Sequence, residues 1–284
     1  MMRFFSTPRL RPALVAAALA FISVPSRAQN DLPVYHPRSL PAGTDWLVTP
    51  VTTKAGVYRS QDGRDLILDN GLVHRAFRLG PNLACYSYQN LTNGQELLRA
   101  LKPEGRLTLD GTAYNVGGLL GQPEMAYLLP AWLDTLHAGS TDFRLVSYTS
   151  GPLRPYLHWR TRTWTGNPGQ PTGAELSLRF TSPLPALQGL EVTVHYELYD
   201  GLPLLVKWLS LENRGGRVFR LDRVAHEILG LVEEESAVVG TPEQMKKQHG
   251  IYVETNYAFN NAMRYDISDQ TTHWLPDPSY TSQV

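Results

Sequence analysis

The sequence predicts an all-β protein, a large antiparallel β-sandwich with one or two short helices. Three dipeptides that favour tight hairpin turns separate segments of alternating polarity: Asn70-Gly71, Asp110-Gly111 and Asp200-Gly201. Within these segments, apolar and polar residues alternate with the period of two expected of half-buried strands. The segments recur about every ten residues and few stretches show helical periodicity, a combination typical of a sandwich and not of an α/β fold.

The turn dipeptides define three expected hairpins, because each tolerates the positive φ of a type I′ turn. The strands that they join are expected over residues 65–69 and 72–79, 106–109 and 112–116, and 191–199 and 202–211. Two segments have a clearly apolar face that should lie in the core, with Leu176, Leu178 and Phe180 in one, and Val192, Val194, Tyr196 and Leu198 in the other. The opposite face of the second segment, with His195 and Glu197, should be wetter.

Only two stretches have helical features. Residues 241–250 begin with Thr241 as a possible N-cap and Pro242 at the first helical position, so we expect one short exposed helix there. Residues 123–137 are apolar but contain Pro130, so we expect short turns packed over a sheet edge. The proline- and glycine-rich residues 152–189 are expected to be loops between strands, with a domain linker as the alternative.

The first 28 residues resemble a signal peptide. Arg3, Arg9 and Arg11 precede an apolar run over residues 13–24, and Ala28 suits cleavage before Gln29. A buried N-terminal helix is the alternative. We therefore expect an exported protein, periplasmic or extracellular, with a signal peptide over 1–28 and an N-terminal extension over 29–44. The β-sandwich domain should follow over 45–284 and is expected to be truncated at its C-terminal end.

The composition excludes several classes of partner. After residues 1–28 are removed, the chain contains 26 acidic and 22 basic residues. It therefore lacks the clustered positive charge that binds nucleic acid or anionic lipid. No later segment is apolar for long enough to span a membrane. Cys85 is the single cysteine, which excludes an intramolecular disulfide. The core alone must therefore hold the exported domain together.

No catalytic or metal-binding motif is present. His226-Glu227 begins like a zinc-protease helix, but Gly230 stands where the second histidine would be required. The nucleophile elbow, the phosphate-binding loop and the dinucleotide fingerprint are all missing. The sequence therefore predicts no catalytic residue, no metal site and no cofactor.

Sugar contact is the remaining chemistry that the residues favour. Aromatic rings stack on the apolar C–H faces of sugars, and polar strand residues can bind the hydroxyl groups. The candidates are two tryptophans, Trp159 and Trp164, and ionisable residues that lie on one face of an expected strand. The latter are His158 on one strand and His195 with Glu197 on another. The alternative is that the tryptophans belong to the core and that the polar groups only solvate a sheet face.

Three groups of residues carry a family resemblance. They are residues 68–77, residues 114–119, and residues 196–203 together with Lys207-Trp208 and Glu212-Asn213. Residues 45–280 resemble the N-terminal domain of family 36-type α-galactosidases. The resemblance implies a β-sandwich of the galactose-mutarotase-like kind, a supersandwich. In the family, this domain precedes a (β/α)₈ barrel that hydrolyses terminal α-galactosides with retention.

The resemblance also implies that the chain lacks the catalytic site, because both catalytic aspartates of the family lie in the barrel. Lys207-Trp208 resembles the strand end that carries the nucleophile, but Leu209 follows it. We therefore expect a non-catalytic N-terminal domain of a secreted α-galactosidase-like glycoside hydrolase, whose partners are an α-galactoside-type carbohydrate and a catalytic barrel in cis. The sequence leaves oligomerisation open.

Two other functions are compatible with these residues. One is a stand-alone carbohydrate-binding module. The other is an aldose-mutarotase-like enzyme in which His195 or His158 is the acid and a glutamate is the base.

Overall fold

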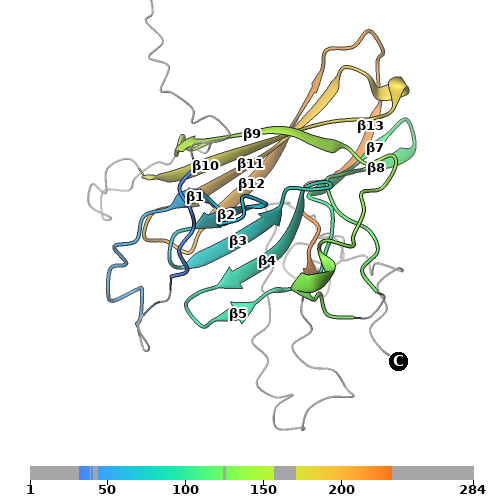
Figure 1. The fold of residues 1–284 in the computed structure, drawn as a ribbon. Helices are drawn as coiled ribbons and strands as arrows, with labels where there is room; N and C mark the ends of the chain where they lie inside the picture. The colour runs from blue at the N-terminus through green and yellow to red at the C-terminus, as the bar shows by residue number, and fades with distance from the viewer. Residues whose placement is uncertain (1–31, 39, 41–43, 124–125, 157–170, 232–284) are drawn as a thin grey trace, which may run out of the picture.

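The prediction of an all-β sandwich is confirmed. The computed structural model describes residues 32–38, 40, 44–123, 126–156 and 171–231 (Figure 1). In these residues antiparallel strands dominate, and the helical structure consists of two 3₁₀ turns, Pro130–Trp132 and Pro185–Leu187. None of the helices in this part of the chain has the length and apolarity needed to cross a membrane.

Two larger sheets form the layers of the sandwich. The five-stranded sheet has the order β1-β2-β3-β4-β5, with β1 (Gly56–Arg59), β2 (Asp65–Asp69), β3 (Val73–Arg78), β4 (Ala84–Asn90) and β5 (Gln95–Glu96). The four-stranded sheet has the order β12-β11-β10-β9, with β9 (Arg144–Pro152), β10 (Gly173–Thr181), β11 (Leu190–Tyr199) and β12 (Leu205–Asn213). In both sheets every neighbouring pair is antiparallel.

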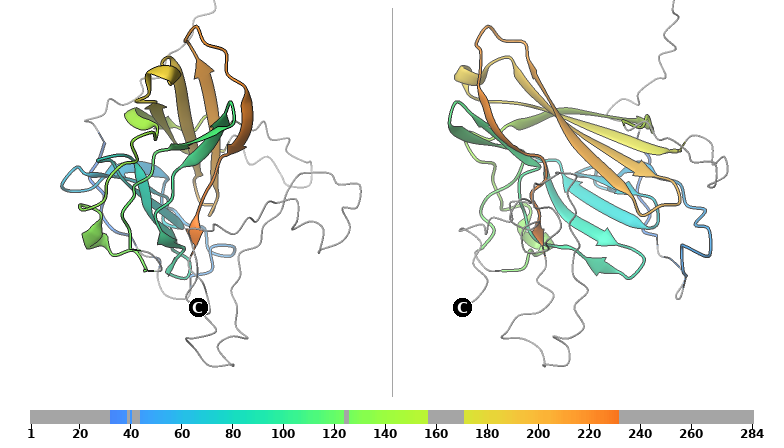
Figure 2. Two further views of the ribbon diagram at one scale, coloured as in Figure 1. Left: turned by 90° about the vertical axis from the view of Figure 1, so that its right-hand side faces the viewer. Right: turned by 180° about the vertical axis from the view of Figure 1, so that it is seen from behind.

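Two small sheets complete the described fold. One has the order β13-β7-β8, with β7 (Gly105–Leu109), β8 (Thr112–Val116) and β13 (Leu221–Ala225). The other pairs β14 (Gly230–Leu231) with β6 (Leu98–Ala100). The β7, β8 and β13 strands lie at one end of the two main layers (Figures 1 and 2).

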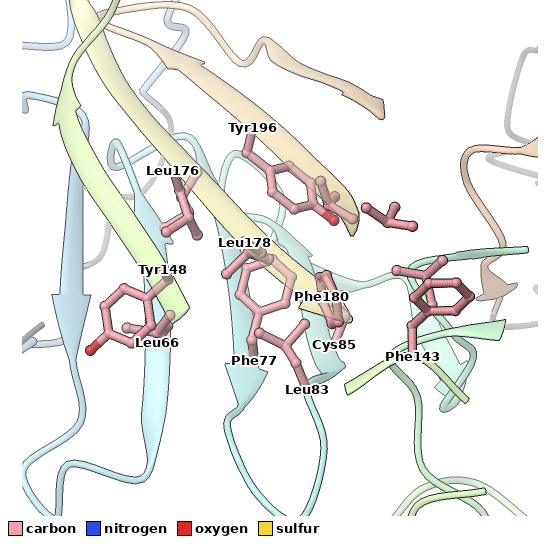
Figure 3. Close-up of a cluster of buried hydrophobic side chains, with 14 of the residues drawn as sticks. Leu66, Phe77, Leu83, Cys85, Phe143, Tyr148, Leu176, Leu178, Phe180 and Tyr196 are labelled. Carbon is pink, nitrogen blue, oxygen red and sulfur yellow. The ribbon is translucent and has the colours of Figure 1, made fainter. Parts of the chain in front are cut away.

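The core lies between the two larger sheets. Every expected core residue of β10 and β11 is fully buried, as the alternation predicted: Leu176, Leu178, Phe180, Val192, Val194, Tyr196 and Leu198. They pack against the inner face of the other sheet, where Leu66 of β2 and Phe77 of β3 are also fully buried (Figure 3). Burial of these apolar side chains is the main favourable contribution to folding.

The three predicted hairpins are present, but only one has the predicted turn. Asp110 and Gly111 have φ values of 49° and 82°, as a type I′ turn requires. In the other two turns only the glycine has a positive φ, 82° at Gly71 and 69° at Gly201. Both of these turns are longer than two residues. Asp69 therefore pairs with His74, and Leu198 pairs with Leu205.

The Asn70 side chain joins these two longer turns. Its Oδ1 accepts hydrogen bonds from the backbone N–H groups of Leu72 and Val73, at 2.9 and 2.8 Å. Its Nδ2 donates to the carbonyl oxygens of Tyr199 and Leu202, both at 2.7 Å. Asn70 is fully buried, so this one amide satisfies polar backbone groups of both sheets.

Replacing Asn70 with alanine should therefore lower the free energy of unfolding by about 2 kcal/mol, because buried backbone groups lose their partners. Urea unfolding followed by circular dichroism measures the change. The matched control is Asn93→Ala, since Asn93 is exposed in the turn between β4 and β5 and water can replace its bonds. Equal losses in the two variants would contradict this role of Asn70.

The stretch 123–137 packs as expected where it is described. It contains the 3₁₀ turn Pro130–Trp132, and Leu133 and Leu136 pack against Ala84 of β4 in a second, smaller apolar cluster. Residues 124–125 lie outside the described part of the chain. So do the expected signal peptide over 1–28 and the expected helix over 241–250.

Candidate functional site

The outer face of the four-stranded sheet is the polar surface to which His195 belongs. Strand register places four side chains of this face in one row across the sheet: Thr149 of β9, Ser177 of β10, His195 of β11 and Trp208 of β12. The row exists because residues that alternate with the core positions must point away from the core. We call this surface, with Ser210 and Tyr156, the outer-face site.

His195 is held on both sides by hydroxyl groups. Its Nδ1 lies 3.0 Å from Ser177 Oγ, and its Nε2 lies 2.8 Å from Ser210 Oγ. Partial burial lowers the pKa of His195, although the negative charge of Glu197 opposes that shift. The imidazole is therefore neutral at pH 7, so that one ring nitrogen donates and the other accepts.

Three aromatic rings stack beside these hydroxyl groups. The His195 and Trp208 rings have centroids 4.8 Å apart and are 10° from parallel. The Tyr156 ring stacks on Trp208 at 4.9 Å and 23°. Tyr156 is 62% exposed, so the stack reaches the protein surface. The outer-face site thus combines flat apolar rings with the exposed hydroxyl group of Ser210.

The alternation predicted a solvent-exposed position for Glu197, but Glu197 is fully buried. Its Oε1 accepts a hydrogen bond from the Tyr156 backbone N–H at 2.6 Å, and its Oε2 accepts one from the Tyr199 hydroxyl at 2.7 Å. The chain that follows β9 passes over this end of β11 and covers the carboxylate. Glu197 therefore positions Tyr156 in the aromatic stack.

Glu175 of β10 lies directly opposite Glu197 in the sheet register. Burial raises the pKa of Glu175, and the like charge of Glu197 adds to this shift, while Arg154 opposes both. Glu175 is only partly buried, so it is the carboxylate that borders the outer-face site.

The structure brings together only part of the predicted sugar-contact set. His195 and Glu197 lie beside each other on β11, whereas His158, Trp159 and Trp164 lie outside the described residues. Sequence reasoning selected neither Tyr156 nor Trp208 as a sugar contact. In the described ranges, no cluster of three or more His, Cys, Asp or Glu side chains is placed to hold a metal ion.

A second group of ionisable residues lies between the sheets, with Arg75 and Glu104 buried and the Glu227 side chain 27% exposed. Its members come from four separate parts of the chain: Arg75 of β3, Glu104 before β7, Lys207 of β12 and Glu227 before β14. Arg75 donates to both oxygens of Glu227, at 3.0 and 3.2 Å. Lys207 Nζ lies 3.1 Å from Glu104 Oε2 and 2.9 Å from Glu227 Oε1. We call these four residues the buried ion cluster.

Neighbouring rings complete the buried ion cluster. The Tyr196 hydroxyl donates to Glu104, and the Arg75 guanidinium lies 5.0 Å from the centroids of both the Tyr196 and Tyr88 rings. Each carboxylate is thus paired with a cation, and each cation also faces an aromatic ring. This arrangement offsets the large cost of removing these charges from most of their water.

The two carboxylates of the cluster are poorly suited to acid–base catalysis, although both bind the Lys207 ammonium. Burial raises the pKa of Glu227, but the charges and hydrogen bonds of Arg75 and Lys207 outweigh burial and lower it to about 2. A general acid needs the opposite, a raised pKa. Glu104 is only 1% exposed, so substrate cannot reach it. The cluster therefore has a structural role.

Comparisons with known proteins give no match: no protein-family model, no curated protein and no solved structure is significantly similar to the chain.

Proposed function

We propose that this chain is a non-catalytic, carbohydrate-binding β-sandwich domain of an exported α-galactosidase-like glycoside hydrolase. In this proposal the domain accompanies a catalytic barrel in cis and binds sugar units of α-galactosides on the outer-face site. The all-β sandwich and the sequence resemblance of residues 45–280 support the domain type. The outer-face site supports the carbohydrate ligand.

The aromatic stack is the observation that carries the proposal. Sugar rings present apolar C–H faces, and these pack on tryptophan and tyrosine rings whose edges remain polar. Tyr156 provides such a ring at the surface and is held there by its stack on Trp208, and Ser210 and Ser177 provide hydroxyl groups beside the stack. The Glu197 carboxylate and the rigid sheet fix the stack in advance, which reduces the entropic cost of binding.

The same geometry favours binding over mutarotation. An acid–base pair for mutarotation must face one substrate with groups that are free to exchange protons. Both oxygens of Glu197 are already bound to Tyr156 and Tyr199, and both nitrogens of His195 are bound to serine hydroxyl groups. A stand-alone carbohydrate-binding module would use the same outer-face site, so it stays the second candidate.

Replacing Trp208 with alanine should weaken binding of methyl α-D-galactopyranoside at least about tenfold, because the exposed Tyr156 ring loses the stacking partner that holds it in place. Chemical-shift titration of the protein measures the dissociation constant. Trp208→Phe keeps a flat ring and should retain most of the affinity. Trp46→Ala removes a tryptophan from a different part of the chain and serves as the matched control.

Two results would contradict the proposed function. If Trp208→Ala and the wild-type protein bind the glycoside equally, the outer-face site does not hold the sugar. If the purified chain hydrolyses a chromogenic α-galactoside and one Asp or Glu substitution removes that activity, the domain is catalytic.

A further inference from the structure

A pocket of about 440 Å³ opens at the seam between the two main sheets. This volume lies within the range of small-molecule sites. The pocket is lined by β1, by the adjoining ends of β9 and β10, and by the chain before β1; the lining residues that matter here are Pro33, Ala55, Tyr58, Ser150, Pro152 and Ala174. It lies on the core side of β9 and β10, whereas the outer-face site lies on the opposite side of the same sheet. The two sites are therefore separate.

Small residues keep this end of the sandwich hollow. Ala174 occupies a core-facing position of β10, one step along the strand from the fully buried Leu176. Ala55 and Gly56 stand on the facing side, at the start of β1. Larger apolar residues at these positions would fill the gap between the sheets, as they do in the rest of the core.

Ser150 supplies an unused polar group in the pocket wall. It stands on β9 directly opposite Leu176, a core-facing register position, and is only 7% exposed. Its hydroxyl oxygen is not among the fully buried polar atoms that lack a partner in the described part of the chain, so it stays open to the pocket. A hydroxyl group that is open to a pocket can both donate to and accept from the molecule that fills it, so Ser150 is available as a polar contact for a ligand.

The other lining residues define the chemistry of that ligand. Among the described residues, no Asp, Glu, Lys, Arg or His side chain lines the pocket, so a charged ligand would find no charged partner there to compensate for its lost hydration. The Tyr58 ring, Pro33 and Pro152 offer apolar surface. The Tyr58 hydroxyl oxygen accepts a hydrogen bond from Arg38 Nη2 at 2.7 Å, which holds the ring in place and leaves its O–H free to donate.

We propose that this pocket is a second sugar site, which binds one neutral pyranose unit and uses the Ser150 hydroxyl as its polar anchor. A pyranose ring is uncharged, has an apolar face for Tyr58 and carries hydroxyl groups that can both donate to and accept from Ser150. The assignment of a sugar rests on the proposed function. The location of the site rests on the pocket and on Ser150.

The test uses the full chain with ¹³C-methyl-labelled alanine and titrates it with methyl α-D-galactopyranoside. The methyl groups of Ala55 and Ala174 report on the pocket, and the indole N–H of Trp208 reports on the outer-face site. Both alanine methyl signals should shift and saturate. Ser150→Ala should weaken this response about fivefold through loss of one hydrogen bond, and Ala55→Leu should abolish it by filling the pocket.

Matched variants separate the pocket from the outer-face site. Thr149→Val removes a hydroxyl group from the same strand but on the opposite face, so the affinity read from the alanine methyl groups should not change. Trp208→Ala should likewise leave the alanine response intact. Galacturonate, which carries a carboxylate, should shift the Trp208 signal without saturating the alanine signals.

The outcomes distinguish the two proposals. Shifts of the Trp208 indole without shifts of the alanine methyl groups would overturn the pocket site and keep the proposed function. Wild-type affinity in Ser150→Ala would overturn the role of Ser150. An absence of both responses would overturn the pocket site and the outer-face site together. A retained Trp208 signal in each pocket variant verifies that the variant is folded.

Discussion

Replacing Arg75 with methionine is expected to lower the free energy of unfolding by about 3–5 kcal/mol, the range typical of breaking a buried ion pair. The substitution keeps an unbranched apolar side chain but removes the guanidinium that binds both oxygens of Glu227 and lies 3.8 Å from Glu104 Oε2. Lys207 would then be the only cation of the cluster left for two carboxylates. Urea unfolding at pH 7 measures the loss.

The matched control for Arg75→Met is Arg214→Met. Arg214 also pairs with a glutamate, Glu212, but that pair is exposed, so its removal should leave the unfolding midpoint unchanged. Arg75→Lys keeps the positive charge without the two-pronged contact and should fall between the wild-type protein and Arg75→Met. A loss below about 1 kcal/mol in Arg75→Met would mean that the orphaned carboxylates find other partners or water.

The second large effect is a loss of stability in acid. The pKa of Glu227 is lowered from 4.5 to about 2 in the folded protein. A lowered carboxyl pKa stabilises the folded state fully above the unfolded pKa, and this contribution disappears as the pH falls through the folded pKa. Glu227 alone should therefore contribute about 3 kcal/mol at pH 7, a contribution that is lost between about pH 4.5 and pH 2.

The comparison of the wild-type protein with Glu227→Gln isolates this titration. The wild-type protein should be more stable by about 3 kcal/mol above pH 5, and the gap should close below pH 2. Asp222→Asn gives a control on a surface carboxylate whose pKa is also lowered, and its stability gap from the wild-type protein should be much smaller than that of Glu227→Gln, because solvent screens the pair with Arg220. Parallel curves for Glu227→Gln would show that Glu227 is not ionised in the cluster.

Both effects come from contacts that join distant parts of the chain. Arg75 and Glu227 are separated by 152 positions, and Lys207 and Glu104 by 103. The buried ion cluster therefore fixes the chain between β13 and β14 onto the two main sheets. Charges between the sheets lower the free energy of unfolding unless each of them is paired. Only one arrangement of the cluster pairs them all, so this arrangement is favoured.

The alternation of residue types was sufficient to predict which faces of β10 and β11 are buried. The face of the sheet to which a side chain points depends only on whether its position in the strand is odd or even. A shift of two residues in register therefore leaves the buried face unchanged. Neighbours across strands do depend on the shift. A two-residue turn at Asp200-Gly201 would place Val206 opposite His195, whereas the observed longer turn places Trp208 there. The turn dipeptide therefore could not predict the aromatic stack.

The buried ion cluster shows the same limit in another form. Arg75 interrupts the apolar set of β3 at a core-facing position, between Val73 and Phe77. Its burial depends on carboxylates that belong to other parts of the chain, and no local sequence pattern predicts that those carboxylates lie beside Arg75. His226-Glu227 gave no local signal beyond an incomplete motif, and Glu227 nevertheless binds Arg75 through both oxygens.

The sequence by itself determined the all-β class, the three hairpins and the buried faces of the central strands, because these follow from the period of the pleat and from local turn preferences. Only the tertiary structure decided that Glu197 is covered, that Ser150 faces a pocket, and that Arg75 has partners. These features depend on how two layers and their connecting segments come together in space. That packing is set by long-range complementarity of shape and charge, which no short stretch of sequence contains.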